Sequence, residues 1–127
     1  PSSAASDVYK RQIQYLTDKK ICLVWGDVAG IQNPAPLTSD FVYLRLIGDR
    51  TIPEQDFGKL QKDRSEQIKS WISKLEKVQD QLSYAIMLAN NRYEGFGPAT
   101  ANKLRVLLGM EELSFVDKRQ KTLFGAP

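Results

Sequence analysis

The stretch FVYLRLIGDR at residues 41–50 decides the fold that this sequence predicts. Apart from Arg45, its first seven residues are aromatic, β-branched or aliphatic, which is typical of a β-strand. Successive side chains of a strand lie on opposite faces, so the run divides into Val42, Leu44 and Leu46 on one face and Tyr43, Arg45 and Ile47 on the other. We expect the aliphatic face to pack against helices and the face of Arg45 to point away from them.

Two further apolar runs and two helical patterns surround this strand. The runs ICLVW at 21–25 and YAIMLA at 84–89 favour strands that are covered on both faces, as in a parallel sheet. Residues 63–80 repeat apolar side chains at helical spacing, and a second helix is expected from Pro98 to a C-cap at Gly109. The apolar stripe of the first helix consists of Ile68, Trp71, Ile72, Leu75 and Val78.

Strands that alternate with helices predict an α/β fold with a parallel sheet. The connection at residues 27–40 departs from the usual pattern, because it contains Gly30, Pro34 and Pro36 and no helical repeat. Apolar strands on their own would also leave unpaired sheet edges, which are an aggregation hazard. The sequence therefore indicates part of a larger sheet.

The opening segment has a separate interpretation. Residues 2–12, SSAASDVYKRQ, match the translation of a widely used transposase sequencing adapter at every position. We therefore expect residues 1–12 to be adapter-derived or disordered and exclude them from the fold, with natural protein continuing upstream of the junction. Residues 13–19 are typical of the end of a helix.

Composition argues against several classes of function. A net charge of +3 at pH 7 is too mild to indicate binding to nucleic acid or to a membrane surface. No apolar run reaches membrane-spanning length, and we expect a cytoplasmic protein. The chain has no histidine, and its one cysteine, Cys22, lies in an apolar run where a buried thiol is expected. These residues predict no metal site within this chain, and they leave the question of a cofactor open.

Three segments together resemble the YecE-like family, catalogued as domain of unknown function 72. They are FVYLRLIGDR at 41–50, DRSEQIKSWISKL at 63–75 and LANNRYEGFGPATANKLRVLLG at 88–109. The family pattern has a YxRxxG strand, a strand that ends in Asn-Asn, and a glycine a few residues later. The matching positions are Tyr43, Arg45, Gly48, Asn90, Asn91 and Gly95.

The resemblance implies a partial TIM-like (β/α) barrel, of which this chain supplies roughly the last three parallel strands with their helices. The barrel part would occupy residues 13–112 and a tail residues 113–127. Many family members carry histidine before the glycine of the arginine strand, where this chain has Ile47. A mechanism that uses this histidine would not carry over, and the resemblance names a fold more than a function.

Active sites of such barrels lie at the C-terminal ends of the strands. The ligand-binding candidates there are Asp27, Arg45, Asp49, Arg50, Asn90 and Asn91. Arg45 is expected to point into the barrel, where it could clamp a phosphate or carboxylate, or form an interior ion pair with Asp27 or an acid of another strand. Asn90 or Asn91 could orient a ligand or close a turn. The sequence identifies no catalytic residue.

The tail carries a separate motif. The segment QKTLF at 120–124 fits the Q-x-x-L-F pattern of peptides that bind replication sliding clamps, with Gln120, Leu123 and Phe124 as the contacting residues. The alternative is that Leu123 and Phe124 pack back onto the barrel. Because short motifs match often by chance, the pattern is a hypothesis only.

Three functions stay open at this point. The first is an enzyme that acts on an anionic small molecule at the barrel mouth, with Arg45 as the clamp. The second is a non-catalytic binding module, and the third is a DNA-maintenance accessory factor that attaches to a sliding clamp through the tail. Direct nucleic-acid or membrane binding is not expected, and the fold alone cannot choose among the three.

The uninterrupted gene tests the expected adapter junction. In the uninterrupted gene, the codons upstream of Ile13 should differ from those of Ser2–Gln12 and should encode further strands. They would also show whether an acid faces Arg45. Sequencing this locus from unfragmented source DNA measures this directly. Natural codons that run straight through Ser2–Gln12 would contradict the adapter origin.

Overall fold

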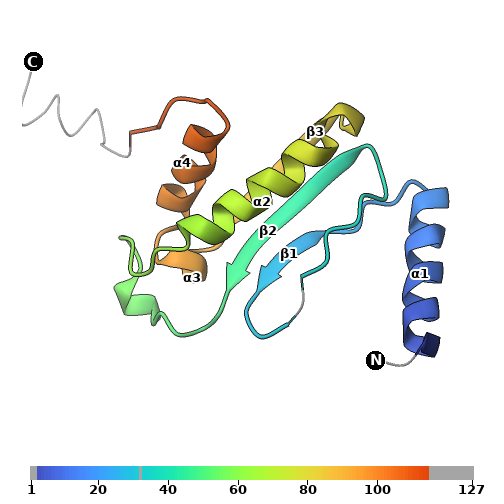
Figure 1. Ribbon diagram of the computed structural model, residues 1–127. Coiled ribbons are helices and arrows are strands. Elements are labelled where there is room, and N and C mark those ends of the chain that lie inside the picture. Colours follow the sequence, from blue (N-terminus) through green and yellow to red (C-terminus); the bar gives the residue numbers. More distant parts are fainter. Residues whose placement is uncertain (1–2, 32, 115–127) are drawn as a thin grey trace, which may run out of the picture.

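The computed structural model describes residues 3–31 and 33–114, which form a sheet with helices packed beside it (Figure 1). The elements are α1 (Ser3–Asp18), β1 (Trp25–Val28), β2 (Phe41–Gly48), α2 (Ser65–Val78), β3 (Tyr84–Ala89), α3 (Asn91–Glu94) and α4 (Gly97–Leu107). Short 3-10 helices lie at Glu54–Asp56 and Gln79–Gln81. The predicted α/β class is confirmed.

The described sheet is parallel, with the strand order β1-β2-β3. In the central strand β2, Leu44 lies beside Trp25 of β1 and Met87 of β3. The observed bounds of β2 and β3 match the predicted strands within one residue, because both runs are rich in residues that fit a pleated sheet. Their parallel pairing also agrees with the predicted β/α order.

Helix α2 lies along one face of the sheet, with α4 beside it (Figure 1). The predicted apolar stripe of α2 is confirmed, since Ile68, Trp71, Ile72 and Leu75 are buried. From the sheet, this core receives Trp25, Val42, Leu44 and Leu46. Burying one such side chain stabilises a fold by about 1.5–3 kcal/mol, so this interface is the main source of stability in the described chain.

The opposite face of the sheet carries large apolar side chains that stay exposed in the described structure. We call it the open face and define it by Gly26, Phe41, Tyr43, Arg45, Ile47, Tyr84, Ile86 and Leu88. In β3, Tyr84, Ile86 and Leu88 are 45–52% exposed and alternate with half-buried residues. Parallel sheets are normally buried on both faces, so this face is suited to being covered.

Strand β1 begins at Trp25 and not at Ile21, so the predicted strand at 21–25 is wrong in position. The cause is the side chain of Thr38, whose Oγ1 accepts from the Leu23 amide at 2.8 Å and donates to the Ile21 carbonyl at 2.6 Å. The backbone before Trp25 is therefore held by a loop side chain instead of a neighbouring strand. No sequence pattern near residue 21 signals this contact.

Two other segments differ from the sequence-based expectation. Helix α1 extends from Ser3 to Asp18 and so includes residues 3–12, which the sequence analysis interprets as adapter-derived or disordered and excludes from the fold. The adapter origin of residues 2–12 is not affected by this and stays a prediction. Residues 91–94 form the short helix α3, which the sequence patterns do not predict, because Asn90 caps its first turn. The connection between β1 and β2 has no helix in its described residues, as predicted.

Two leucines on neighbouring strands test the one-sided core. Leu46 is fully buried on the helix side, and Leu88 is 46% exposed on the open face. We expect Leu46→Ala to lower the free energy of unfolding by about 3 kcal/mol, since it opens a cavity. Leu88→Ala should cost about 1 kcal/mol or less. Urea denaturation measures both, and equal losses would contradict the one-sided core.

Candidate functional site

Arg45 lies on the open face, as predicted from the alternation of β2. In the sheet register it is flanked by Gly26 of β1 and Leu88 of β3. Its side chain is exposed, and no ion pair of Arg45 occurs within residues 3–31 and 33–114. A guanidinium with five donors is therefore available on an otherwise apolar surface.

Asp27 lies on the other face of the sheet, opposite to Arg45. Its Oδ2 accepts hydrogen bonds from Tyr93 Oη at 2.5 Å and Trp71 Nε1 at 2.9 Å. The predicted alternative of an Asp27–Arg45 ion pair is therefore wrong, because adjacent register positions point in opposite directions. Burial, together with the Asp27 carboxylate, raises the pKa of Tyr93 above its usual range, so the phenol stays a donor.

Both asparagines after β3 close turns. Asn90 Oδ1 accepts from the Arg92 amide at 2.8 Å, which makes Asn90 the N-cap of α3. Asn91 Oδ1 accepts from the Gly97 amide at 2.7 Å. The turn interpretation is thus confirmed for both residues, while a ligand-orienting role stays a prediction. Asn90 also continues the ladder, since its amide donates to the Leu46 carbonyl.

Asp49 is the centre of a polar cluster at the end of β2. Its carboxylate accepts from Thr51, from Lys62 Nζ at 3.2 Å and from Arg64 Nη2 at 3.0 Å. Hydrogen bonds from the hydroxyl and the amide of Thr51 hold the pKa of Asp49 well below its usual range. Burial opposes them, and the hydrogen bond and charge of Lys62 add to the lowering. Asp49 therefore acts as a structural anchor for the following loop, and Arg50 beside it is exposed.

Glu94 is a residue that sequence reasoning missed. It is fully buried, with Oε1 accepting from Thr100 Oγ1 at 2.6 Å and Oε2 accepting from Lys103 Nζ at 2.5 Å. Oε2 also accepts from the Arg64 amide at 2.8 Å, at the start of α2. One carboxylate thus connects α3, α4 and the N-terminus of α2.

Backbone geometry holds this acid in place. Gly95 has φ +119°, and a Cβ there would come within 2.4 Å of the Lys59 carbonyl oxygen. The Glu94 carbonyl accepts from the amides of Gln61 and Lys62 at 2.6 and 3.0 Å. The loop before α2 is therefore fixed against the turn after β3, and only glycine fits at residue 95.

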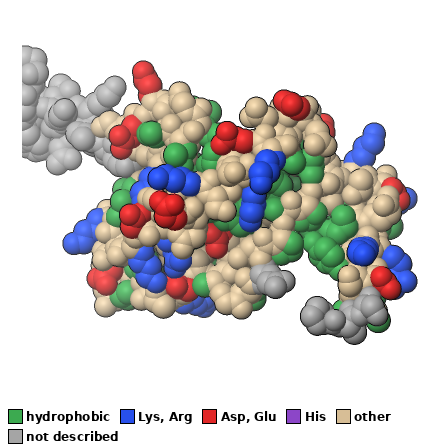
Figure 2. Space-filling view, in the orientation of Figure 1, with side chains coloured by type: hydrophobic (Ala, Val, Ile, Leu, Met, Phe, Trp, Pro, Cys, Tyr) green, Lys and Arg blue, Asp and Glu red, His purple; other side chains and the backbone are tan. Residues whose placement is uncertain are grey.

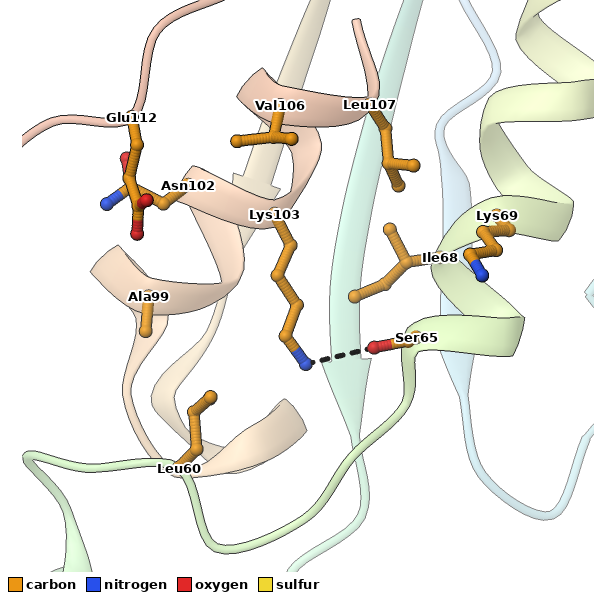
Figure 3. A pocket seen from close by; sticks show the side chains of 10 residues that line it. All are labelled: Leu60, Ser65, Ile68, Lys69, Ala99, Asn102, Lys103, Val106, Leu107 and Glu112. Carbon is orange, nitrogen blue, oxygen red and sulfur yellow. Dashed lines mark hydrogen bonds between the residues drawn. The ribbon is translucent and has the colours of Figure 1, made fainter.

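A cavity of about 370 Å³ lies between α2 and α4 (Figure 3). Its described lining consists of Leu60, Ser65, Ile68, Lys69, Ala99, Asn102, Lys103, Val106, Leu107 and Glu112. The ammonium of Lys103 already donates to Glu94, to Ser65 Oγ at 3.2 Å and to Asp63 at 3.3 Å. These three bonds use its three donors, so the polar end of the cavity is satisfied by the protein itself.

The pKa values in this cluster follow from the same contacts. Partial burial alone would lower the pKa of Lys103, but the hydrogen bonds and charges of Glu94 and then of Asp63 together outweigh it and raise the value. Hydrogen bonds from Ser65, and then from Lys103, lower the pKa of Asp63 to about 2. Both groups are therefore charged at neutral pH and form a structural ion-pair network.

Charges on the helix side of the molecule are mixed. Figure 2 shows Lys and Arg side chains next to Asp and Glu side chains instead of a field of one sign. Among the described residues, no helix is long and apolar enough to span a membrane. The same part of the chain holds no group of three potential metal-ligating acids or cysteines. Gln120, Leu123 and Phe124 lie outside the described residues, so the sliding-clamp motif stays a prediction.

Together these features define an α/β protein with a parallel sheet, helices on one face and polar clusters at the strand ends. A family model described as "Protein of unknown function DUF72" matches residues 4–123, and the chain belongs to this family. No curated protein matches the chain.

Two solved structures are similar to the chain. A DUF72 family protein from Thermotoga maritima MSB8 shares 17% identity with a TM-score of 0.55, covering 78% of this chain and 41% of that one. A DUF72 family protein from Enterococcus faecalis V583 shares 17% identity with a TM-score of 0.54, covering 87% of this chain and 45% of that one. At this identity the likeness shows the fold alone, and the chain spans less than half of either protein.

Replacement of Glu94 tests its role as a structural anchor. Glu94→Gln leaves the Lys103 ammonium without its buried counter-charge, so we expect the free energy of unfolding to fall by roughly 3 kcal/mol or more. The matched control is Glu66→Gln, whose side chain is 88% exposed and pairs with Lys69 at 3.5 Å. Glu66→Gln should lower the free energy of unfolding by about 0.5 kcal/mol. Urea denaturation at pH 7 compares them, and similar losses would refute the anchor.

Acid stability tests the Asp49 cluster. A carboxyl with a lower pKa in the folded chain stabilises the fold above its unfolded pKa of about 3.9, and this stabilisation is lost as the pH falls through the folded pKa. We therefore expect the melting temperature of the wild type to fall more steeply than that of Asp49→Asn below pH about 4. Circular dichroism melts between neutral and acidic pH measure this. Parallel curves for the two proteins would show that the cluster does not stabilise the fold.

Proposed function

We propose that this chain forms part of a (β/α) barrel whose interior is the open face, and that Arg45 binds the anionic group of a small molecule there. The observation that carries the proposal is the exposed guanidinium of Arg45, which has no ion-pair partner in the described chain, on a face of apolar side chains. In barrels of this class, ligands bind at the C-terminal ends of the strands.

Physical chemistry supports an anion at this position. Once the open face is covered, an unpaired guanidinium would carry a large desolvation penalty. Asp27 cannot relieve it, because that carboxylate faces Trp71 and Tyr93 on the helix side. The partner of Arg45 is then either a ligand or an acid outside this chain. The planar guanidinium can donate two parallel hydrogen bonds, which suits a carboxylate or a phosphate as that partner.

An enzyme and a non-catalytic binding module would share this clamp. The open face as defined contains no carboxylate, and Asp49 and Glu94 are engaged in structural clusters. Anion binding is therefore the part of the function that the described residues support best. Turnover of a bound anion by a barrel that contains this chain would favour the enzyme.

Isotope-edited NMR of the full chain tests the clamp. Inorganic phosphate, acetate and 3-phenylpropionate are added to the labelled protein, and the Arg45 side-chain resonance is followed. We expect saturable shifts for at least one probe, a loss of binding of roughly tenfold or more in Arg45→Ala, and partial retention in Arg45→Lys, which keeps the charge but loses the fork.

Lys77→Ala is the control, since Lys77 is also an exposed cation but lies on α2, which packs against the opposite face of the sheet. It should leave the binding of every probe unchanged. If Arg45→Ala binds all three anions as the wild type does, or if no probe binds, the proposed clamp is wrong.

A further inference from the structure

The position next to Arg45 on β1 is occupied by Gly26, which has no side chain. The two residues are register partners, and neighbouring strands lie about 4.8 Å apart. A Cβ built on Gly26 would meet a single neighbouring atom within 4 Å among the described residues, Val28 Cγ2 at 4.0 Å. Arg45 therefore has an open space beside its stem on the β1 side.

The side chains around this space are apolar. Leu88 is the register partner of Arg45 on the β3 side and is 46% exposed. One step nearer the start of the strands, Tyr43 pairs with Ile86, which is 45% exposed. The space next to Gly26 is thus bounded by one cation and by apolar surface.

The charge of the open face limits the kind of anion. Arg45 is the single cation among the residues that define this face. Beyond the end of β2, Lys62 and Arg64 are paired with Asp49. One cation balances a carboxylate, whereas a phosphate monoester carries a charge of about −1.5 to −2 at neutral pH and would remain partly unpaired.

We propose that Gly26 and Arg45 form a subsite for a small organic monocarboxylate with an apolar body. The carboxylate lies in the space over Gly26 and accepts two parallel hydrogen bonds from the Arg45 fork. The apolar body contacts Leu88, Ile86 and Tyr43. This subsite rests on the proposed anion clamp and adds its ligand class and a second residue that determines specificity.

Titration of the full chain with the same three probes tests the subsite. In the wild type, 3-phenylpropionate should bind roughly tenfold more tightly than acetate or inorganic phosphate, because only it offers both a monoanion and an apolar body. Gly26→Val should weaken 3-phenylpropionate by about tenfold or more, since the valine fills the space. Valine suits a strand, so the fold should be retained.

Two variants serve as controls. Ala29→Val adds the same kind of bulk at an exposed position just beyond β1 and should not change binding. Gly26→Ala adds a single methyl group and should weaken the binding of 3-phenylpropionate by about threefold. If Gly26→Val lowers the melting temperature, Gly26→Ala is used for the comparison in its place.

The outcomes separate the subsite from the clamp. Unchanged binding of 3-phenylpropionate in folded Gly26→Val, or tighter binding of phosphate than of 3-phenylpropionate in the wild type, overturns the subsite. Arg45-dependent binding in either case would leave the anion clamp standing. Loss of Arg45 dependence for every probe overturns both.

Discussion

The described structure depends on the packing of two helices against one face of a three-stranded parallel sheet. Strand geometry sends alternate side chains to opposite faces, so covering one face decides the environment of every strand residue. Leu44 and Leu46 are therefore buried in the core on the helix side, and Arg45 between them is exposed on the open face. The same rule turns Asp27 toward the helices and leaves Gly26 beside Arg45. Core and candidate site are therefore two consequences of one constraint.

The acids near the strand ends are used to hold this arrangement together. Asp27 connects β1 to α2 through Trp71, and Glu94 connects α3 to α4 through Lys103. Asp49 fixes the loop that leads into α2. Because these carboxylates are engaged in structural contacts, the open face retains a cation without a described counter-charge. That imbalance is the chemical feature that an anionic ligand would complement.

Sequence reasoning succeeds where the determinants are local and fails where they are distant. The strand at 41–47 and the stripe of α2 follow from periodicity alone. The burial of Glu94 depends on Lys103 nine residues later and on the Arg64 amide thirty residues earlier, which no local pattern encodes. The start of β1 likewise depends on Thr38, fifteen residues from the Leu23 amide that it binds. Strand alternation predicts which face of the sheet Asp27 lies on, but only once the bounds of β1 are known.

Cysteine accessibility along β2 tests the one-sided sheet most directly. Single cysteines at Val42, Tyr43, Leu44 and Arg45, each in a Cys22→Ser background, are reacted with iodoacetamide under native conditions. We expect the alkylation rate to alternate, slow at the buried positions 42 and 44 and at least about tenfold faster at 43 and 45, because alternate side chains face the helices. Uniform rates, or the opposite alternation, would contradict the account, since Arg45 would then not lie on an open face.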